Sequence, residues 1–240
     1  MSSAAVVSVA GSPGVTTLAC AVAVASGEDR ALLVVEAATS GAAIAARWRL
    51  DVRDTVTTTA RLAMEASGTV DLWAAAHQPW LASSRVIPAH PSPVVMRQAQ
   101  VARWLATHLT SVHQPVLIDA GRVDGSVEQF DLLAAADAVW VLVDPIVEQV
   151  VAARAVAEWL NATGPVHLLV REPAGDPARD SAGALASTLG WPVAATVPDD
   201  PQSARALCGL SPARRNLARA PLIRTGKAVA DRLAAVKGPA

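Results

Sequence analysis

The chain has 240 residues, of which 52% are hydrophobic and 17% are charged, so one α/β domain over residues 1–240 is the expected organisation. The 20 Lys and Arg side chains nearly balance the 21 Asp and Glu side chains, which argues against charge-driven binding of nucleic acid. The only lysines are Lys227 and Lys237, so nearly all of the cationic side chains are arginines.

The predicted elements alternate between short β-branched runs and longer Ala-rich segments of helical period. The runs are apolar almost throughout, which is typical of a parallel sheet covered by helices on both faces. We therefore predict a doubly wound α/β fold with a mostly parallel sheet of about seven strands. Apart from one short strand, Gly68–Pro93 is expected to form surface loops. In chain order, the predicted elements are strand Ala4–Val9, helix Thr16–Ala25, strand Ala31–Glu36, helix Asp54–Ala66, strand Arg85–Pro88, helix Val94–Leu109, strand Pro115–Asp119, helix Ser126–Ala135, strand Ala138–Val143, helix Val147–Ala162, strand Val166–Val170, helix Ala178–Leu189, strand Pro192–Val197, and helices Gln202–Leu207 and Pro221–Val236.

The first predicted strand runs directly into a glycine-containing loop, Ala10–Thr17, and then into a helix. This order places backbone N–H groups at a helix N-terminus, where they can receive phosphate oxygens. Against the P-loop pattern G-x-x-x-x-G-K-[ST], only Gly14 and Thr16 match, because Val9 and Val15 occupy the first Gly and the Lys positions. The same turn also occurs in α/β domains without a ligand, so the loop alone leaves both interpretations open.

Over nearly its whole length, the chain resembles the ParA/MinD family of chromosome-partitioning and division-site ATPases, whose loop reads K-G-G-x-G-K-T-T. This resemblance implies the P-loop NTPase fold of the deviant Walker A type. Besides the loop, it rests on segments in the family's order: Leu32–Gly41, Val116–Gly121, Ala138–Pro145, Val166–Arg171 and Leu189–Asp200.

The departures from the family pattern fall at charged positions. Ala10 and Val15 stand where the family has its two loop lysines, and Ala38 stands where it has the second acid after the second strand. Val170 replaces the Asn that reads adenine. No arginine lies in the loop or its helix, so we do not expect arginine to replace the lysines. Phosphoryl transfer depends on charge neutralisation, and the resemblance with these losses implies a protein without ATP turnover.

The resemblance also assigns roles to the residues that remain. Thr16 takes the position whose hydroxyl holds Mg²⁺, with Asp119 as a second metal-side group, and Thr17 takes the α-phosphate position. The full set of candidate cofactor-binding residues is Gly11, Gly14, Val15, Thr16, Thr17, Glu36, Asp119, Pro198 and Asp199. Without a ligand, Thr16 would cap the helix and Asp119 would cap the turn after its strand.

Other features bear on location and partners. The apolar start lacks a basic signal-peptide region, and no apolar run reaches membrane length, so we expect a cytoplasmic protein. Cys20 and Cys208 form no disulfide framework. We expect the amphipathic Pro221–Val236 helix to dock on the core instead of anchoring to a membrane. The segment from Trp73 to Pro93 is the candidate surface for a protein partner, with anchors Trp73, Trp80, Leu81, Val86 and Ile87.

Together these observations favour a non-hydrolysing spatial organiser or assembly factor in pilus, secretion, division or partitioning machinery. The CpaE/TadZ-like branch is the subgroup that the degenerate loop resembles. We expect no required cofactor, weak binding of ATP or ADP with Mg²⁺ at most, a protein partner, and any homodimer to be independent of ATP. Two alternatives stay open: a working ATPase or nucleotide-binding switch with an unorthodox loop, and a small-molecule enzyme of the related synthetase branch.

Overall fold

The computed structural model describes residues 2–11, 13–26, 31–40, 43–66, 70–79, 84–98, 101–109, 112–172, 182–210 and 217–236. Its strands form one seven-stranded sheet in the order β3-β2-β4-β1-β5-β6-β7, and every neighbouring pair is parallel. The predicted fold class is therefore confirmed. The strands are β1 (Ser3–Ser8), β2 (Leu33–Glu36), β3 (Arg85–Ile87), β4 (Val116–Arg122), β5 (Ala138–Val143), β6 (Val166–Glu172) and β7 (Val193–Pro198).

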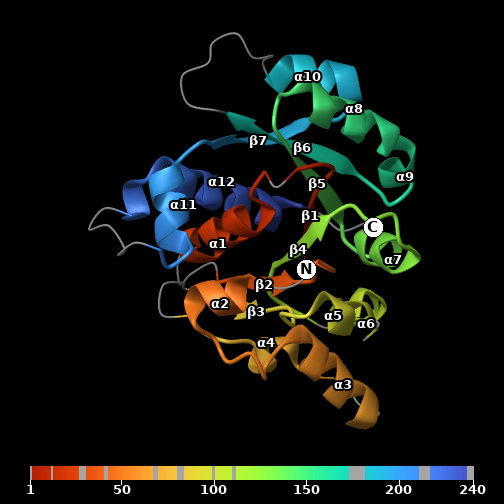
Figure 1. Ribbon diagram of the computed structural model, residues 1–240, viewed down its shortest axis with the longest axis vertical. Helices are drawn as coiled ribbons and strands as arrows, with labels where there is room; N and C mark the ends of the chain where they lie inside the picture. Colours follow the sequence, from red (N-terminus) through yellow and green to blue (C-terminus); the bar gives the residue numbers. More distant parts are fainter. Residues whose placement is uncertain are drawn as a thin grey trace.

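Helices cover both faces of the sheet (Figure 1). Alternate residues of each strand point to opposite faces, so Ala5 and Val7 of β1 join one apolar cluster while Ala4 and Val6 join the other. One face carries α1 (Val15–Ala25), α2 (Ile44–Trp48), α11 (Pro201–Leu207) and α12 (Pro221–Ala235). The other face carries α3 (Val56–Ala66), α4 (Leu72–Ala75), α5 (Pro93–Gln98), α6 (Val101–His108), α7 (Val127–Ala134), α8 (Val147–Ala155), α9 (Ala157–Asn161) and α10 (Ala182–Leu189).

The predicted helices need three corrections. The segment predicted as Val147–Ala162 is two helices, because Val156 leaves the helical conformation with φ −109° and ψ 5°. The helix predicted over Val94–Leu109 is observed as α5 and α6, which flank residues 99–100, outside the described part of the chain. The short helix α2 was not predicted. Gly68–Pro93 is not all loop outside its strand, since Asp71 caps α4 by accepting from the N–H groups of Trp73 and Ala74.

Helix α12 docks on the core, as predicted, and packs against α1 (Figure 1). Gly226 makes the close approach possible, because a Cβ at this position would lie 2.6 Å from the carbonyl oxygen of Ala21. The apolar side of α12, including Ile223, Val229 and Leu233, is buried between α1 and the sheet. Within the described residues, no helix is both long and apolar enough to cross a membrane.

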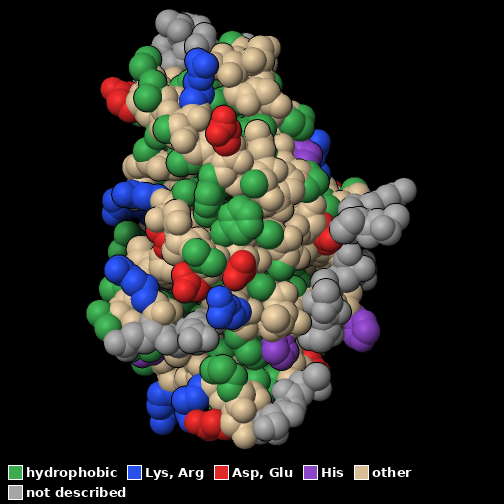
Figure 2. All heavy atoms as spheres, turned by 90° about the vertical axis from the view of Figure 1, so that its right-hand side faces the viewer, with side chains coloured by type: hydrophobic (Ala, Val, Ile, Leu, Met, Phe, Trp, Pro, Cys, Tyr) green, Lys and Arg blue, Asp and Glu red, His purple; other side chains and the backbone are tan. Residues whose placement is uncertain are grey.

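Charged side chains of both signs are interspersed on the face drawn in Figure 2. Lys and Arg side chains stand singly or in small groups among Asp and Glu, without a continuous basic field.

Candidate functional site

The loop between β1 and α1 is shaped by two glycines in the left-handed region. Gly11 has φ +65° and Gly14 has φ +103°, conformations that side chains with a Cβ rarely adopt. Gly14 is the N-cap of α1, and its carbonyl oxygen accepts from the N–H of Leu18 at 2.8 Å. No side chain caps this helix and its first turn carries no acid. Its N-terminus is therefore favourable for an anion.

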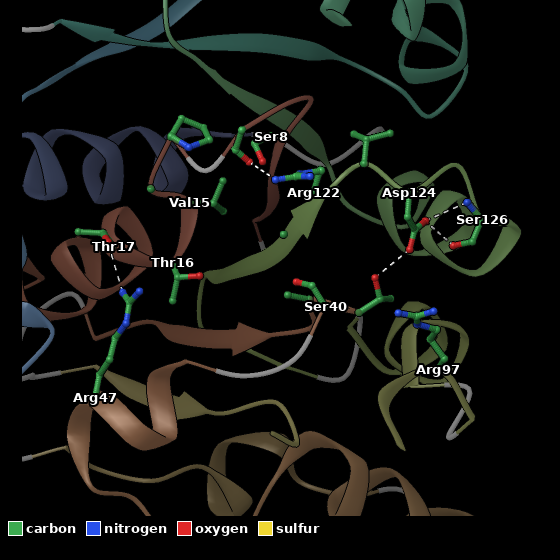
Figure 3. Close-up of a pocket in the computed structure, with 17 residues that line it drawn as sticks. Ser8, Val15, Thr16, Thr17, Ser40, Arg47, Arg97, Arg122, Asp124 and Ser126 are labelled. Carbon is green, nitrogen blue, oxygen red and sulfur yellow. Dashed lines mark hydrogen bonds between the residues drawn. The ribbon is translucent and has the colours of Figure 1, made fainter. Parts of the chain in front are cut away.

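A cavity of about 780 Å³ opens beside this loop, over the carboxyl ends of β1, β2 and β4 (Figure 3). Open α/β sheets bind ligands at this edge, and the volume is within the range of small-molecule sites. The predicted residues Gly11, Gly14, Val15, Thr16 and Thr17 all line the cavity. The remaining lining residues are Ser8, Pro13, Ala38, Thr39, Ser40, Arg47, Arg97, Gly121, Arg122, Val123, Asp124 and Ser126.

Val15 belongs both to the wall of the cavity and to the hydrophobic core. Its side chain is 6% exposed and packs in the cluster that contains Leu18 and Val22 of the same helix. A lysine at this position would project a charge toward the phosphate site, whereas valine adds only apolar surface. The loop backbone is therefore arranged to suit an anion, but the loop has no cationic side chain of its own.

Three arginines from other elements line the cavity, although the loop and its helix carry none. Arg122 ends β4 and donates a hydrogen bond to the carbonyl oxygen of Gly11. Arg47 of α2 donates from Nη1 to the hydroxyl of Thr17 at 3.2 Å. Arg97 of α5 lines the side of the cavity opposite Arg47 (Figure 3). These three arginines are distant in sequence, and only the fold brings them to the same cavity.

Glu36 and Asp119, the two predicted acids, lie side by side beneath this region and do not line the cavity. The Glu36 carboxylate accepts from the backbone N–H groups of Ala43 at 2.7 Å, Ile44 at 3.2 Å and Ala89 at 3.1 Å. It thus fixes the start of α2 and the segment that follows β3. Burial and the neighbouring Asp119 raise the pKa of Glu36 to about 7. Its observed contacts are structural.

Asp119 has one oxygen with a partner and one without. Oδ1 accepts from the N–H of Gly121 at 3.1 Å, while the buried Oδ2 makes no hydrogen bond in the described part of the chain. Burial raises the pKa of Asp119, and the nearby Thr16 hydroxyl and Gly121 N–H oppose that rise. The carboxylate therefore has spare acceptor capacity close to a residue that lines the cavity.

Pro198 and Asp199 lie in a smaller groove of about 170 Å³ on the other side of the loop, together with Gly14 and Thr17. Arg171 also lines this groove, and its guanidinium pairs with Asp199 at 2.9 Å and with Asp144 at 3.3 Å. The two predicted base-side residues are thus next to the loop. One of them is already engaged by an arginine.

The predicted protein-docking segment is largely part of the core. Val86 and Ile87 are 0% and 1% exposed in β3, so their assignment as surface anchors is wrong. Trp73 is half-buried against the core, and its ring lies 5.0 Å from the guanidinium carbon of Arg85. Trp80 and Leu81 lie outside the described residues.

The sheet order, with the glycine loop at the centre of the sheet, matches the fold of solved MinD and ParA-family ATPases. No family model and no curated protein matches the sequence. Three of the solved structures that share this fold illustrate the likeness.

The cell division ATPase MinD of Pyrococcus furiosus has a TM-score of 0.75 and 17% identity, over 98% of this chain and 99% of that one. MinD of Pyrococcus horikoshii, complexed with Mg-ADP, has a TM-score of 0.74 and 14% identity, over 97% and 95%. The MinC:MinD complex of Aquifex aeolicus has a TM-score of 0.68 and 16% identity, over 100% and 98%. The chain thus has the MinD fold over nearly its full length.

Proposed function

We propose that this protein is a non-hydrolysing relative of the MinD and ParA ATPases that acts as a spatial organiser or assembly factor through contacts with other proteins. The observation that carries the proposal is the burial of Val15, 6% exposed, where a catalytic lysine is expected. An apolar side chain held in the core cannot neutralise charge that develops on a transferred phosphoryl group. The scaffold is kept while its loop cation is lost.

The site nevertheless fits Mg²⁺ and a nucleotide phosphate as bound ligands. Asp119 has a buried carboxylate oxygen without a hydrogen-bond partner in the described residues, and Thr16 lies beside it at the uncapped start of α1. Mg²⁺ is commonly held by one or two protein oxygens, with water and phosphate completing its shell. Thr16 and Asp119 would supply those oxygens. The bound ion would neutralise phosphate charge.

A role through protein contacts is supported by the fold and by the packing of α12. MinD of Aquifex aeolicus, which shares the fold, has been solved with the protein MinC. The apolar face of α12 is used in packing against α1, so it is not available to bind a lipid surface. The candidate contact surface is the edge of the sheet around the cavity, where loops from several strands meet.

Phosphate release from Mg-ATP tests the proposal. Wild-type protein and Thr16→Ala are incubated under the same conditions, and inorganic phosphate is followed for several hours. We expect equal release, at the rate of the buffer blank. Faster release by the wild type, lost in Thr16→Ala, would show a working ATPase. A parallel pull-down from native lysate, with Arg61→Gln as an exposed control, is expected to recover the same partners with and without ATP.

A second candidate function is a nucleotide-dependent small-molecule enzyme, and one observation favours it. The cavity continues beyond the loop to a polar wall that includes Thr39, Asp124 and Ser126. Thr39 donates to Asp124 at 2.8 Å, which holds this wall in place. ATP consumption that starts only when a library of small carboxylates and amines is added would support this candidate, and the absence of any such response would exclude it.

A further inference from the structure

We infer that Arg47, Arg97 and Arg122 replace the missing loop lysines and make the cavity a binding site for a polyphosphate anion. This inference rests on the proposed function, because it takes the loop cavity as a phosphate site. The three side chains approach from different sides (Figure 3). Nothing in the loop itself supplies a positive charge.

Arg122 is placed by strand register. Its backbone pairs with Ser8 at the end of β1, so its side chain lies beside the first residues of the loop. The preceding Gly121 has φ +69°, and a Cβ there would lie 2.8 Å from the Cβ of Ala38. Only glycine fits that turn, which aims the strand end toward the loop. Arg122 then reaches the carbonyl oxygen of Gly11 and retains further N–H donors for an anion.

Arg47 is placed by the buried Glu36. Because the Glu36 carboxylate binds the N–H groups of Ala43 and Ile44, the start of α2 is fixed directly under the cavity. The helix is also held by Trp48, whose indole N–H donates to the carbonyl oxygen of Leu207 at 2.9 Å. Arg47 is therefore pre-positioned at Thr17, in the first turn of α1. Pre-positioning lowers the entropy lost when a ligand binds.

Arg97 enters from α5, on the far side of the cavity from Arg47 (Figure 3). Glu36 contributes here too, since its second oxygen accepts from the N–H of Ala89 in the segment leading to α5. The exposed Arg97 side chain makes no ion pair with a carboxylate in the described part of the chain. It is a cation held at the mouth of a cavity without a fixed counter-charge.

The balance of charge in the cavity favours an extended anion. The lining residues include three arginines and one acid, Asp124. Both Asp124 oxygens already accept hydrogen bonds, Oδ2 from Thr39 and Oδ1 from Ser126. The guanidinium fork matches phosphate oxygens in bidentate geometry. Cations on opposite sides, with an uncapped helix start between them, suit a chain of two or three phosphates better than a single one.

Titration calorimetry tests this site. Wild-type protein is titrated with inorganic tripolyphosphate, pyrophosphate and phosphate, and with ATP, at two salt concentrations. We expect tripolyphosphate to bind more tightly than phosphate, with affinity falling as salt rises. Arg47→Gln, Arg97→Gln and Arg122→Gln are each expected to weaken tripolyphosphate binding about tenfold. Arg61→Gln removes an exposed arginine of α3 and is expected to leave affinity unchanged.

Two further readouts separate the possible outcomes. Arg47→Lys keeps the charge but not the fork, so intermediate affinity with unchanged unligated thermal unfolding distinguishes recognition from a folding defect. Failure of the wild type to bind any polyphosphate, or wild-type affinity in all three Gln variants, would overturn the inference and leave the proposed non-hydrolysing role standing. ATP turnover by the wild type, together with weakened polyphosphate binding in the Gln variants, would overturn the proposed non-hydrolysing role and support the inference. Equal binding of tripolyphosphate and ATP would identify the phosphate chain as the recognised part.

Discussion

Glu36 and Asp119 occupy paired positions in the neighbouring parallel strands β2 and β4, and both are 0% exposed. Two ionised carboxylates in this arrangement would repel each other without water to screen them. The two acids are stabilised unequally: Glu36 receives backbone N–H groups from two segments, whereas Asp119 receives the N–H of Gly121 on Oδ1 and no hydrogen bond on Oδ2 in the described residues. The pair therefore favours holding a proton or a cation.

Stability is predicted to depend on pH through this pair. Burial first, and Asp119 second, raise the pKa of Glu36 to about 7 from an ordinary value of 4.5. The native state binds the proton more tightly than the unfolded chain, so the stabilisation is complete below pH 4.5 and is lost as pH rises through 7. From pH 8 to pH 6, the free energy of unfolding should rise by about 1 kcal/mol.

Urea unfolding at several pH values, without divalent cations, checks this expectation. Asp119→Asn removes the neighbouring charge, so the Glu36 pKa should fall and the pH dependence should become shallower. Asp131→Asn, at a half-exposed acid of α7, serves as the control and should behave as the wild type. Parallel curves for wild type and Asp119→Asn would show that the two acids are not coupled.

Val15→Lys is predicted to lower the free energy of unfolding and to raise the affinity for ATP. Removing a buried valine side chain from the core should cost about 1–2 kcal/mol in the free energy of unfolding. Since Val15 also lines the cavity, the lysine can extend its ammonium there, and ATP affinity should rise about tenfold. The exposed Val127→Lys controls for net charge. No gain in affinity would mean that the backbone around Gly14 does not cradle phosphate.

Gly226→Ala is predicted to loosen the packing of α12 on α1. The added methyl group would lie 2.6 Å from the carbonyl oxygen of Ala21, which is backbone and cannot rotate away. The two helices must separate, at a cost of about 1–3 kcal/mol. Lys227→Ala on the exposed side of α12 should change stability by less than about 0.5 kcal/mol. Chemical unfolding of both variants measures the difference, and equal stabilities would contradict the assigned contact.

Association is predicted to be independent of ATP. The resemblance to the ParA/MinD family implies that a loop lysine bridges the two subunits through nucleotide, and Ala10 stands at that position. Any dimer should then form through apolar surface. Sedimentation velocity should give the same species with and without Mg-ATP. A monomer that dimerises only when ATP is added would favour the nucleotide-switch alternative.

The strands could be predicted because most are short apolar runs; the central β1 and β5 are buried on both faces, and the edge strand β7 is partly exposed. The errors fall where tertiary contacts decide local structure. Helix α2 has only five residues and begins where the Glu36 carboxylate binds its first N–H groups, a contact that no local pattern shows. Val86 and Ile87 lie in a proline-rich stretch but pair with β2, which buries them.

The loop of the site could be predicted, and its cations could not. Strand β4 was expected to end at Asp119, because Gly121 and a charged residue are poor strand formers. The strand continues after a register shift near Val6 and Val7, and this extension delivers Arg122. The carboxyl ends of parallel strands meet at one edge, which is a signal that could have pointed to Arg122. Arg47 and Arg97 lie in short helices that carried no such signal.

We propose that the cavity holds a nucleotide phosphate chain without cleaving it. The decisive measurement is to incubate Mg-ATP with an excess of the protein for one day, separate bound from free nucleotide by ultrafiltration, and identify both by chromatography. We expect ATP to be recovered with the wild type, and less bound nucleotide with Arg122→Gln. Recovery of ADP from the wild type, with ATP unchanged in the protein-free control, would contradict it.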